Sequence, residues 1–170
     1  MGITIADFET PRWFACHTKP RCEKKFAALL TAESFEHYLP LVESVRNYQK
    51  KKRTFLKPLF TGYVFSKIPP TMRTKVYQQD LLVRALWIEN QELFIRQMEH
   101  VRIVVDSGIK ATLRPLVKKG VFVRINSGPF KGLEGFVENP DSPRGIVVAL
   151  DILQQGLLVP VPLEQLKVLC

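Results

Sequence analysis

The chain has 170 residues, enough for one medium domain or two small ones, and its 46% hydrophobic content suffices for a packed core. Its 25 Lys and Arg residues against 16 Asp and Glu residues give a net charge of +9, which favours a polyanionic partner, either nucleic acid or an anionic membrane. No apolar run approaches the roughly 20 residues that span a bilayer, and the first residues lack the pattern of a secretory signal, so we expect a cytoplasmic protein with no membrane partner.

Cysteine and histidine residues do not form a pattern typical of an enzyme or a metal site. The three cysteines (Cys16, Cys22 and Cys170) are too few for a disulfide framework, and no paired CxxC motif indicates zinc. The histidines are scattered, and no glycine-rich phosphate-binding loop is present. We therefore expect reduced thiols, no catalytic residues, no metal and no cofactor.

The first predicted elements are a strand and a helix. Residues 1–12 show no periodicity and are expected to form a flexible lead-in. A strand is predicted at residues 13–17, and Thr18 is expected to cap a helix that begins near Pro20, where a missing N–H costs nothing. In that helix Cys22, Phe26, Leu29 and Leu30 share one stripe, which predicts its core-facing side.

Two extended segments, 37–48 and 55–66, predict a long antiparallel hairpin with a basic tip. The tip is the run Lys50, Lys51, Lys52 and Arg53, flanked by Arg46 and Lys57. A second basic group on the first helix is formed by Arg21, Lys24 and Lys25. Each basic group could be an ordinary solvated surface or could contact nucleic acid, and the sequence leaves both interpretations open.

The remaining pattern divides the chain into two domains. A short helix at 71–79 and a strand at 82–88 precede a third helix, whose apolar stripe is Phe94, Met98, Val101 and Val105 and which should end at Gly108. These elements predict one α+β domain over residues 13–106. Residues 107–116 form a polar linker, and short β segments separated by turns over 117–170 predict a small barrel.

Several of these segments together resemble the N-terminal domain of NusG-like transcription elongation factors. They are Trp13-Phe14, the turn Thr18-Lys19-Pro20-Arg21, the step Tyr38-Leu39-Pro40 and the block Pro58-Leu59-Phe60-Thr61-Gly62-Tyr63-Val64-Phe65. Residues 123–137, with the core Ser-Gly-Pro-Phe-Lys-Gly-Leu-Glu-Gly, resemble a KOW motif. The resemblance implies an α+β fold in which an NGN-type antiparallel sheet flanked by helices is linked to a small SH3-like β-barrel KOW domain.

The resemblance also implies a function without catalysis. Such a factor docks on RNA polymerase and suppresses pausing or termination, and in the family an aromatic strand binds the clamp helices of the largest polymerase subunit. The matching residues are Phe60, Tyr63 and Phe65; filling the core is an open alternative, above all for Phe60. Position 61 departs from the family, because relatives commonly place Pro where this chain has Thr61, so a softer bend before Gly62 is expected.

Further partners follow from the same resemblance. Family members lie beside the upstream DNA and the non-template strand, which favours a DNA-proximal position for Lys50, Lys51, Lys52 and Arg53 and makes Arg21, Lys24 and Lys25 a second candidate. The loop that contains Phe130 corresponds to one that contacts a small-subunit ribosomal protein or the termination factor Rho in relatives, which would couple transcription to translation. A cap over the barrel's end is the alternative for Phe130. A monomer is expected.

Two functional alternatives stay open at the level of sequence. Within the family, the divergent segment 81–87 favours a specialised antiterminator, a paralogue of the RfaH or UpxY type, over a general factor. Outside it, a ribosome-associated or RNA-binding KOW-domain protein would carry the same second motif.

Overall fold

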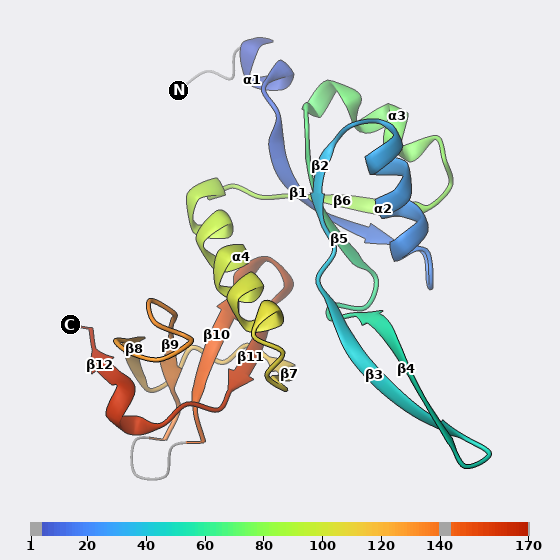
Figure 1. Ribbon diagram of the computed structural model, residues 1–170. Coiled ribbons are helices and arrows are strands. Elements are labelled where there is room, and N and C mark those ends of the chain that lie inside the picture. Colours follow the sequence, from blue (N-terminus) through green and yellow to red (C-terminus); the bar gives the residue numbers. More distant parts are fainter. Residues whose placement is uncertain (1–4, 140–143, 170) are drawn as a thin grey trace. The chain divides into compact units, whose positions relative to one another are not determined.

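The structure is a computed structural model that describes residues 5–139 and 144–169 and divides into two compact units, one up to Gln91 and one from Glu92 (Figure 1). The elements of the first unit are α1 (Ile5–Glu9), β1 (Arg12–Thr18), α2 (Glu23–Ala32), β2 (Glu36–Tyr38), β3 (Leu41–Tyr48), β4 (Lys51–Pro58), β5 (Tyr63–Ile68), the 3₁₀ helix η1 (Pro70–Met72), α3 (Arg73–Tyr77) and β6 (Leu82–Trp87). Helix α1 thus occupies part of the segment expected to be a flexible lead-in.

A four-stranded antiparallel sheet with the order β2, β5, β1, β6 forms the centre of the first unit. Strand β1 lies in the middle because its residues are apolar on both faces, which is typical of a strand covered on both sides. Its register shifts between His17 and Thr18 where it pairs with β6. The mixed α/β content and the antiparallel pairing agree with the α+β class predicted from the sequence.

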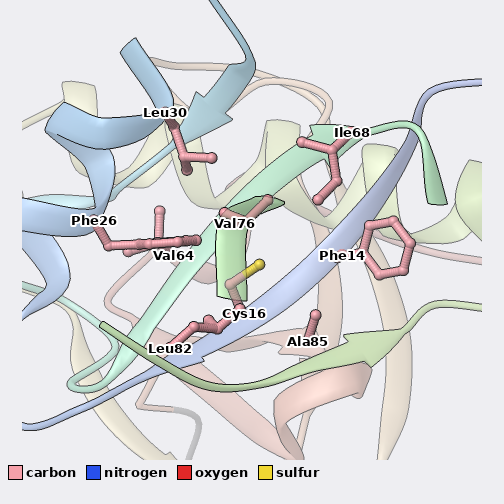
Figure 2. Close-up of a cluster of buried hydrophobic side chains, with 9 residues drawn as sticks. All are labelled: Phe14, Cys16, Phe26, Leu30, Val64, Ile68, Val76, Leu82 and Ala85. Atoms are coloured by element: carbon pink, nitrogen blue, oxygen red, sulfur yellow. The ribbon is translucent and has the colours of Figure 1, made fainter. Parts of the chain in front are cut away.

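One face of this sheet packs against α2 and α3 (Figure 2). The buried side chains of this cluster are Phe14, Cys16, Phe26, Leu30, Val64, Ile68, Val76, Leu82 and Ala85. On β1 the contributing residues are two apart and on β5 four apart, as the pleat requires, whereas on β6 they are three apart because the register shifts there. The helix stripe predicted for α2 is confirmed at Phe26 and Leu30, whereas Leu29 is partly buried and Cys22 precedes the helix.

The predicted cap of α2 is wrong. Helix α2 begins at Glu23 after Cys22, not near Pro20, and no side chain caps it. Thr18 is instead the last residue of β1, where its backbone N–H donates to the carbonyl of Gly62 at 2.8 Å. Strand pairing therefore continues through Thr18, and Arg21, at φ +61°, turns the chain into the helix.

The predicted hairpin is present as a separate two-stranded sheet of β3 and β4, which extends away from the four-stranded sheet (Figure 1). Its turn is formed by Gln49 and Lys50, both with positive φ, the conformation that a two-residue hairpin turn demands. Residues Lys51 to Arg53 are not in the turn but in β4, because their backbones pair with Tyr48, Asn47 and Arg46.

The second unit combines one long helix with a six-stranded antiparallel sheet. Its elements are α4 (Gln91–Asp106, which begins in the first unit), β7 (Thr112–Pro115), β8 (Val121–Ile125), β9 (Glu134–Val137), β10 (Ile146–Leu150), the 3₁₀ helix η2 (Asp151–Leu153), β11 (Gln155–Val159), the 3₁₀ helix η3 (Leu163–Gln165) and β12 (Leu166–Val168). Strand β7 lies within the segment predicted to be a polar linker and pairs with β11. No described helix is both long and apolar enough to cross a membrane.

The strand order of this sheet is β12, β8, β9, β10, β11, β7. No pairing among the described residues joins β12 to β7, so a closed barrel stays a prediction. Gly120, at φ +100°, precedes β8, and a Cβ there would lie 1.9 Å from the carbonyl oxygen of Val137, which explains the glycine. In α4 the predicted stripe holds at Phe94, Met98 and Val101, but Val104 is buried in place of Val105.

A pH-dependent stability is expected from His100 on α4. Burial lowers its pKa from the ordinary value of 6.5, Glu134 and Glu99 raise it, and Arg96 and Arg124 lower it further. The folded state therefore prefers the neutral ring. As pH falls below about 6.5 the unfolded chain binds the proton first, so the free energy of unfolding should decrease.

The change His100→Gln should remove this contribution. We expect the wild type to lose more stability than the variant between pH 7.5 and pH 5, measured by urea denaturation at each pH. Equal losses in the two proteins would contradict the burial of a neutral His100.

Candidate functional site

The face of the first unit's sheet opposite α2 and α3 carries Tyr63 and Phe65, two of the three aromatic residues predicted to bind a partner, and Phe60 lies in the segment just before β5. Tyr63 and Phe65 lie two apart on β5 and so share one face. The rings of Phe60 and Phe65 pack edge to face, with centroids 6.0 Å apart and planes at 78°. Phe60 is 1% exposed and Phe65 is 0% exposed. Both phenylalanines therefore fill the core in this structure, which was the alternative to a partner contact.

Tyr63 differs from the two phenylalanines because the residue is only half-buried. It stacks on the imidazole of His17 on β1, with centroids 4.9 Å apart and planes at 18°. Arg84 on β6 is exposed and lies opposite His17 in the strand register. An aromatic and cationic row thus crosses this end of the sheet, suited to a partner with an apolar contact and polar groups at its edge.

A hydrogen-bonded clamp holds the loop before Tyr63. The backbone N–H of Gly62 donates to the Oε1 atom of Glu23 at 2.8 Å, and the Gly62 carbonyl accepts from the N–H of Thr18. Gly62 has φ +82°, a conformation that strains any residue with a Cβ. Glu23 is 5% exposed and stands in the first turn of α2, where a carboxylate is favoured. The sequence interpretation missed Glu23, although an acidic residue at a helix start was the available signal.

Removing the clamp should destabilise the first unit. The change Glu23→Ala leaves the buried N–H of Gly62 without its acceptor, and we expect the free energy of unfolding to fall by about 1 to 3 kcal/mol. A matched control is Glu36→Ala, because Glu36 pairs with Lys67 at 3.3 Å on the exposed edge strand and such pairs contribute under about 1 kcal/mol. Chemical denaturation measures both; equal effects would show that Glu23 is not a clamp.

The two basic groups predicted from the sequence lie on different elements. Lys24 on α2 donates from Nζ to the carbonyl of Leu56 at 2.7 Å, which ties the helix to β4. Lys25 is exposed on the same helix, and exposed Arg21 lies in the turn before it. The run is exposed where the hairpin turns: Lys50 lies in the turn, and Lys51, Lys52 and Arg53 are the first residues of β4.

Phe130, for which the sequence left a partner contact and a cap over the barrel's end as alternatives, is buried. Phe130 is 3% exposed, in the loop between β8 and β9. That loop is closed by backbone hydrogen bonds from Leu133 to Phe130 and from Gly132 to Ile125, at 3.0 and 2.8 Å, and Ile125 and Leu133 are themselves fully buried. The ring thus joins the core of the second unit, which is the capping alternative.

Neither a nucleophile nor a metal-binding group stands out in the described residues. Burial raises the pKa of the Cys16 thiol to about 11, against a smaller opposing effect of the hydrogen bond with Ser66, whose Oγ lies 3.1 Å from Sγ. Cys16 is therefore protonated at neutral pH. Cys16 and Cys22 are free thiols, and Cys170 lies outside the described residues. Within 5–139 and 144–169, no three His, Cys, Asp or Glu side chains gather as metal ligands.

Comparisons with known proteins address the family directly. The family model described as NusG, transcription termination factor nusG, matches residues 11–108. A solved crystal structure of an MjSpt4:Spt5 complex, conformation B, is similar over 92% of this chain and 95% of its own chain, with 18% sequence identity and a TM-score of 0.30. No curated protein sequence matches the chain. Because the family model covers more than half of the residues, the chain belongs to the NusG family of transcription factors.

Proposed function

We propose that this chain is a transcription elongation factor that binds RNA polymerase and suppresses pausing or termination. The observation that carries the proposal is the NusG family match over residues 11–108. The matched segment contains both the half-buried Tyr63 with its Glu23 clamp and the basic hairpin. We take 13–106 as the polymerase-binding NGN domain, and the factor as a cytoplasmic monomer without catalytic activity.

The partner surface that we propose is the clamp helices of the largest polymerase subunit, contacted at the open end of the sheet. Tyr63 supplies the contact, because the residue is partly accessible and a tyrosine offers a large apolar area with a polar edge. Phe60 and Phe65 act from beneath, by fixing the position of β5. Lys50 to Arg53, with Arg21, Lys24 and Lys25, lie beside the upstream or non-template DNA.

For the C-terminal part we propose a KOW domain of the SH3-like barrel type over residues 117–170, after a linker at 107–116 whose second half forms β7 and pairs with β11. The motif at residues 123–137 and the antiparallel pairing of β8 and β9 support this assignment. Its partner is a small-subunit ribosomal protein or Rho, approached by the exposed residues of the loop 127–132. Phe130 shapes this loop from the core. A ribosomal partner would couple transcription to translation.

Within the family we propose a specialised antiterminator. The support is the segment 81–87, whose sequence diverges from the family pattern. A general elongation factor is the alternative that the test below also addresses.

The proposal is tested by adding the purified protein to elongation complexes of core RNA polymerase. We expect it to bind core polymerase and to shorten pauses or raise read-through at terminators. A specialised factor would do so only on templates with a particular recruiting sequence, and a general factor on all templates. Sedimentation with ribosomal particles and no binding to polymerase would overturn the proposal in favour of a ribosome-associated protein.

A further inference from the structure

We infer that one face of the β3–β4 hairpin binds single-stranded nucleic acid, with aromatic rings stacking on bases and cations contacting phosphates. The inference rests on the proposed function, which places the hairpin beside nucleic acid. It adds which face of the hairpin makes the contact and which form of nucleic acid it takes.

The strand register divides the hairpin residues between two faces. Residues directly opposite each other in an antiparallel pair point to the same side. The pairs Ser44 with Phe55, Arg46 with Arg53, and Tyr48 with Lys51 therefore share one face, called here the Arg46 face. Lys57, which pairs with Val42, continues it. The intervening pairs, Glu43 with Leu56, Val45 with Thr54, and Asn47 with Lys52, form the opposite face.

Charge on the Arg46 face is not balanced within the hairpin. Arg46 and Arg53 are exposed and directly opposite each other, an arrangement of like charges that destabilises a strand pair. The only acidic residue between positions 41 and 58 is Glu43, which lies on the opposite face. No ion pair to Arg46, Lys51 or Arg53 is formed by any residue that the structure describes. A polyanion would relieve this repulsion.

Aromatic rings lie between these cations. Tyr48 is 55% exposed beside the turn, and the guanidinium of Arg46 stands over the ring of Phe55 at 5.1 Å from its centroid. An alternation of cations and aromatic rings along an extended surface is the pattern that binds unpaired bases and their backbone without sequence preference. A two-stranded ribbon can also enter the major groove of a duplex. In a duplex, however, the bases are stacked on one another, so no base face is free to stack on the ring of Tyr48. The exposed tyrosine therefore favours a single strand.

The chain offers matched controls for each part of this inference. Arg53→Gln and Lys52→Gln each remove one positive charge at adjacent positions on opposite faces. Tyr48→Ala and Val45→Ala each truncate an exposed apolar side chain, again on opposite faces. All four positions are exposed, so the fold should persist, which circular dichroism of each variant checks.

The experiment measures binding of the full-length protein to labelled 20-nucleotide probes by fluorescence anisotropy over a range of salt concentrations. The probes are an oligo(dT) strand, the same strand with abasic sites in place of thymines, and a duplex of equal length. We expect Tyr48→Ala to weaken binding to oligo(dT) by about 5- to 100-fold, as expected for loss of a stacked base, and to leave abasic binding nearly unchanged. A plot of the logarithm of the binding constant against the logarithm of the salt concentration has a slope that reports the number of phosphate contacts. Arg53→Gln should reduce the magnitude of this slope by about 0.7, as expected for the loss of one phosphate contact, and Lys52→Gln should reduce it by clearly less.

Three outcomes would overturn the inference. They are tighter binding to the duplex than to the single strand, equal effects of Arg53→Gln and Lys52→Gln, or a loss on Tyr48→Ala that is the same for abasic and intact strands. Polymerase binding is measured separately with the same variants. If the variants on the Arg46 face weaken oligonucleotide binding more than those on the opposite face, but the protein does not bind polymerase, the proposed function alone is overturned. If the protein binds polymerase but the variants on the two faces have equal effects on oligonucleotide binding, this inference alone is overturned.

Discussion

Replacing Phe65 with Ala should lower the free energy of unfolding by about 3 to 5 kcal/mol, the usual cost of removing a fully buried aromatic ring. Phe65 is 0% exposed, on a strand paired on both sides, and its ring packs edge to face against Phe60. The cavity left by the change cannot collapse easily, because the strands around it are fixed by their backbone hydrogen bonds. Urea denaturation followed by circular dichroism would measure the loss.

A control for this prediction is Phe8→Ala on α1. Phe8 is 45% exposed, so its truncation should change the unfolding free energy by less than about 1 kcal/mol. A similarly small change on Phe65→Ala would show that Phe65 is not part of the core and would restore it as a contact residue.

Replacing Tyr63 with Ala should weaken binding to core RNA polymerase by about 2 to 4 kcal/mol, or about 30- to 1,000-fold, if Tyr63 is a hot spot of the interface. The variant loses the stacking contact with His17, but Tyr63 is only half-buried, so the protein should stay folded. The change Tyr63→Phe keeps the ring and should retain most of the affinity. Titration of labelled protein with polymerase gives the affinities.

The two tyrosine variants separate an interface effect from a folding effect. Loss of polymerase binding together with loss of the folded circular dichroism signal in Tyr63→Ala would assign Tyr63 to the core. Unchanged affinity in a folded Tyr63→Ala would remove it from the interface.

Much of the element order was predictable because the chain's apolar periodicity agrees with its packing. Helix α4 is an example: Phe94, Met98 and Val101 recur at helical spacing and are buried. The hairpin was predictable from two extended segments around a polar run. In these segments local sequence and tertiary structure favour the same conformation.

Other features depend on partners that are distant in the sequence. Thr18 matches a capping pattern, but pairing with the loop at Gly62 keeps it in the strand. Phe130 follows a Gly-Pro turn typical of an exposed loop, yet the loop folds back and buries the ring. Strand β7 forms in a polar segment because β11 provides an unpaired edge. A single sequence does not show which distant edge or carboxylate will meet these residues.

The candidate site was also predictable from the sequence only in part. Its aromatic residues stood out by composition, but only the structure separates the accessible Tyr63 from the buried Phe60 and Phe65. The two faces of the hairpin depend on a register that the turn at Gln49 and Lys50 sets.

Site-specific crosslinking from position 63 can identify the protein surface that Tyr63 contacts. A photoreactive phenylalanine analogue would replace Tyr63 in the full-length protein, with Val83, exposed on the edge strand β6, carrying the same group as a control. After mixing with core RNA polymerase and ribosomes together, we expect a crosslink from position 63 to the clamp helices of the largest polymerase subunit that is much stronger than any from position 83. Crosslinks from position 63 to ribosomal proteins alone, or equal polymerase crosslinks from both positions, would contradict this expectation.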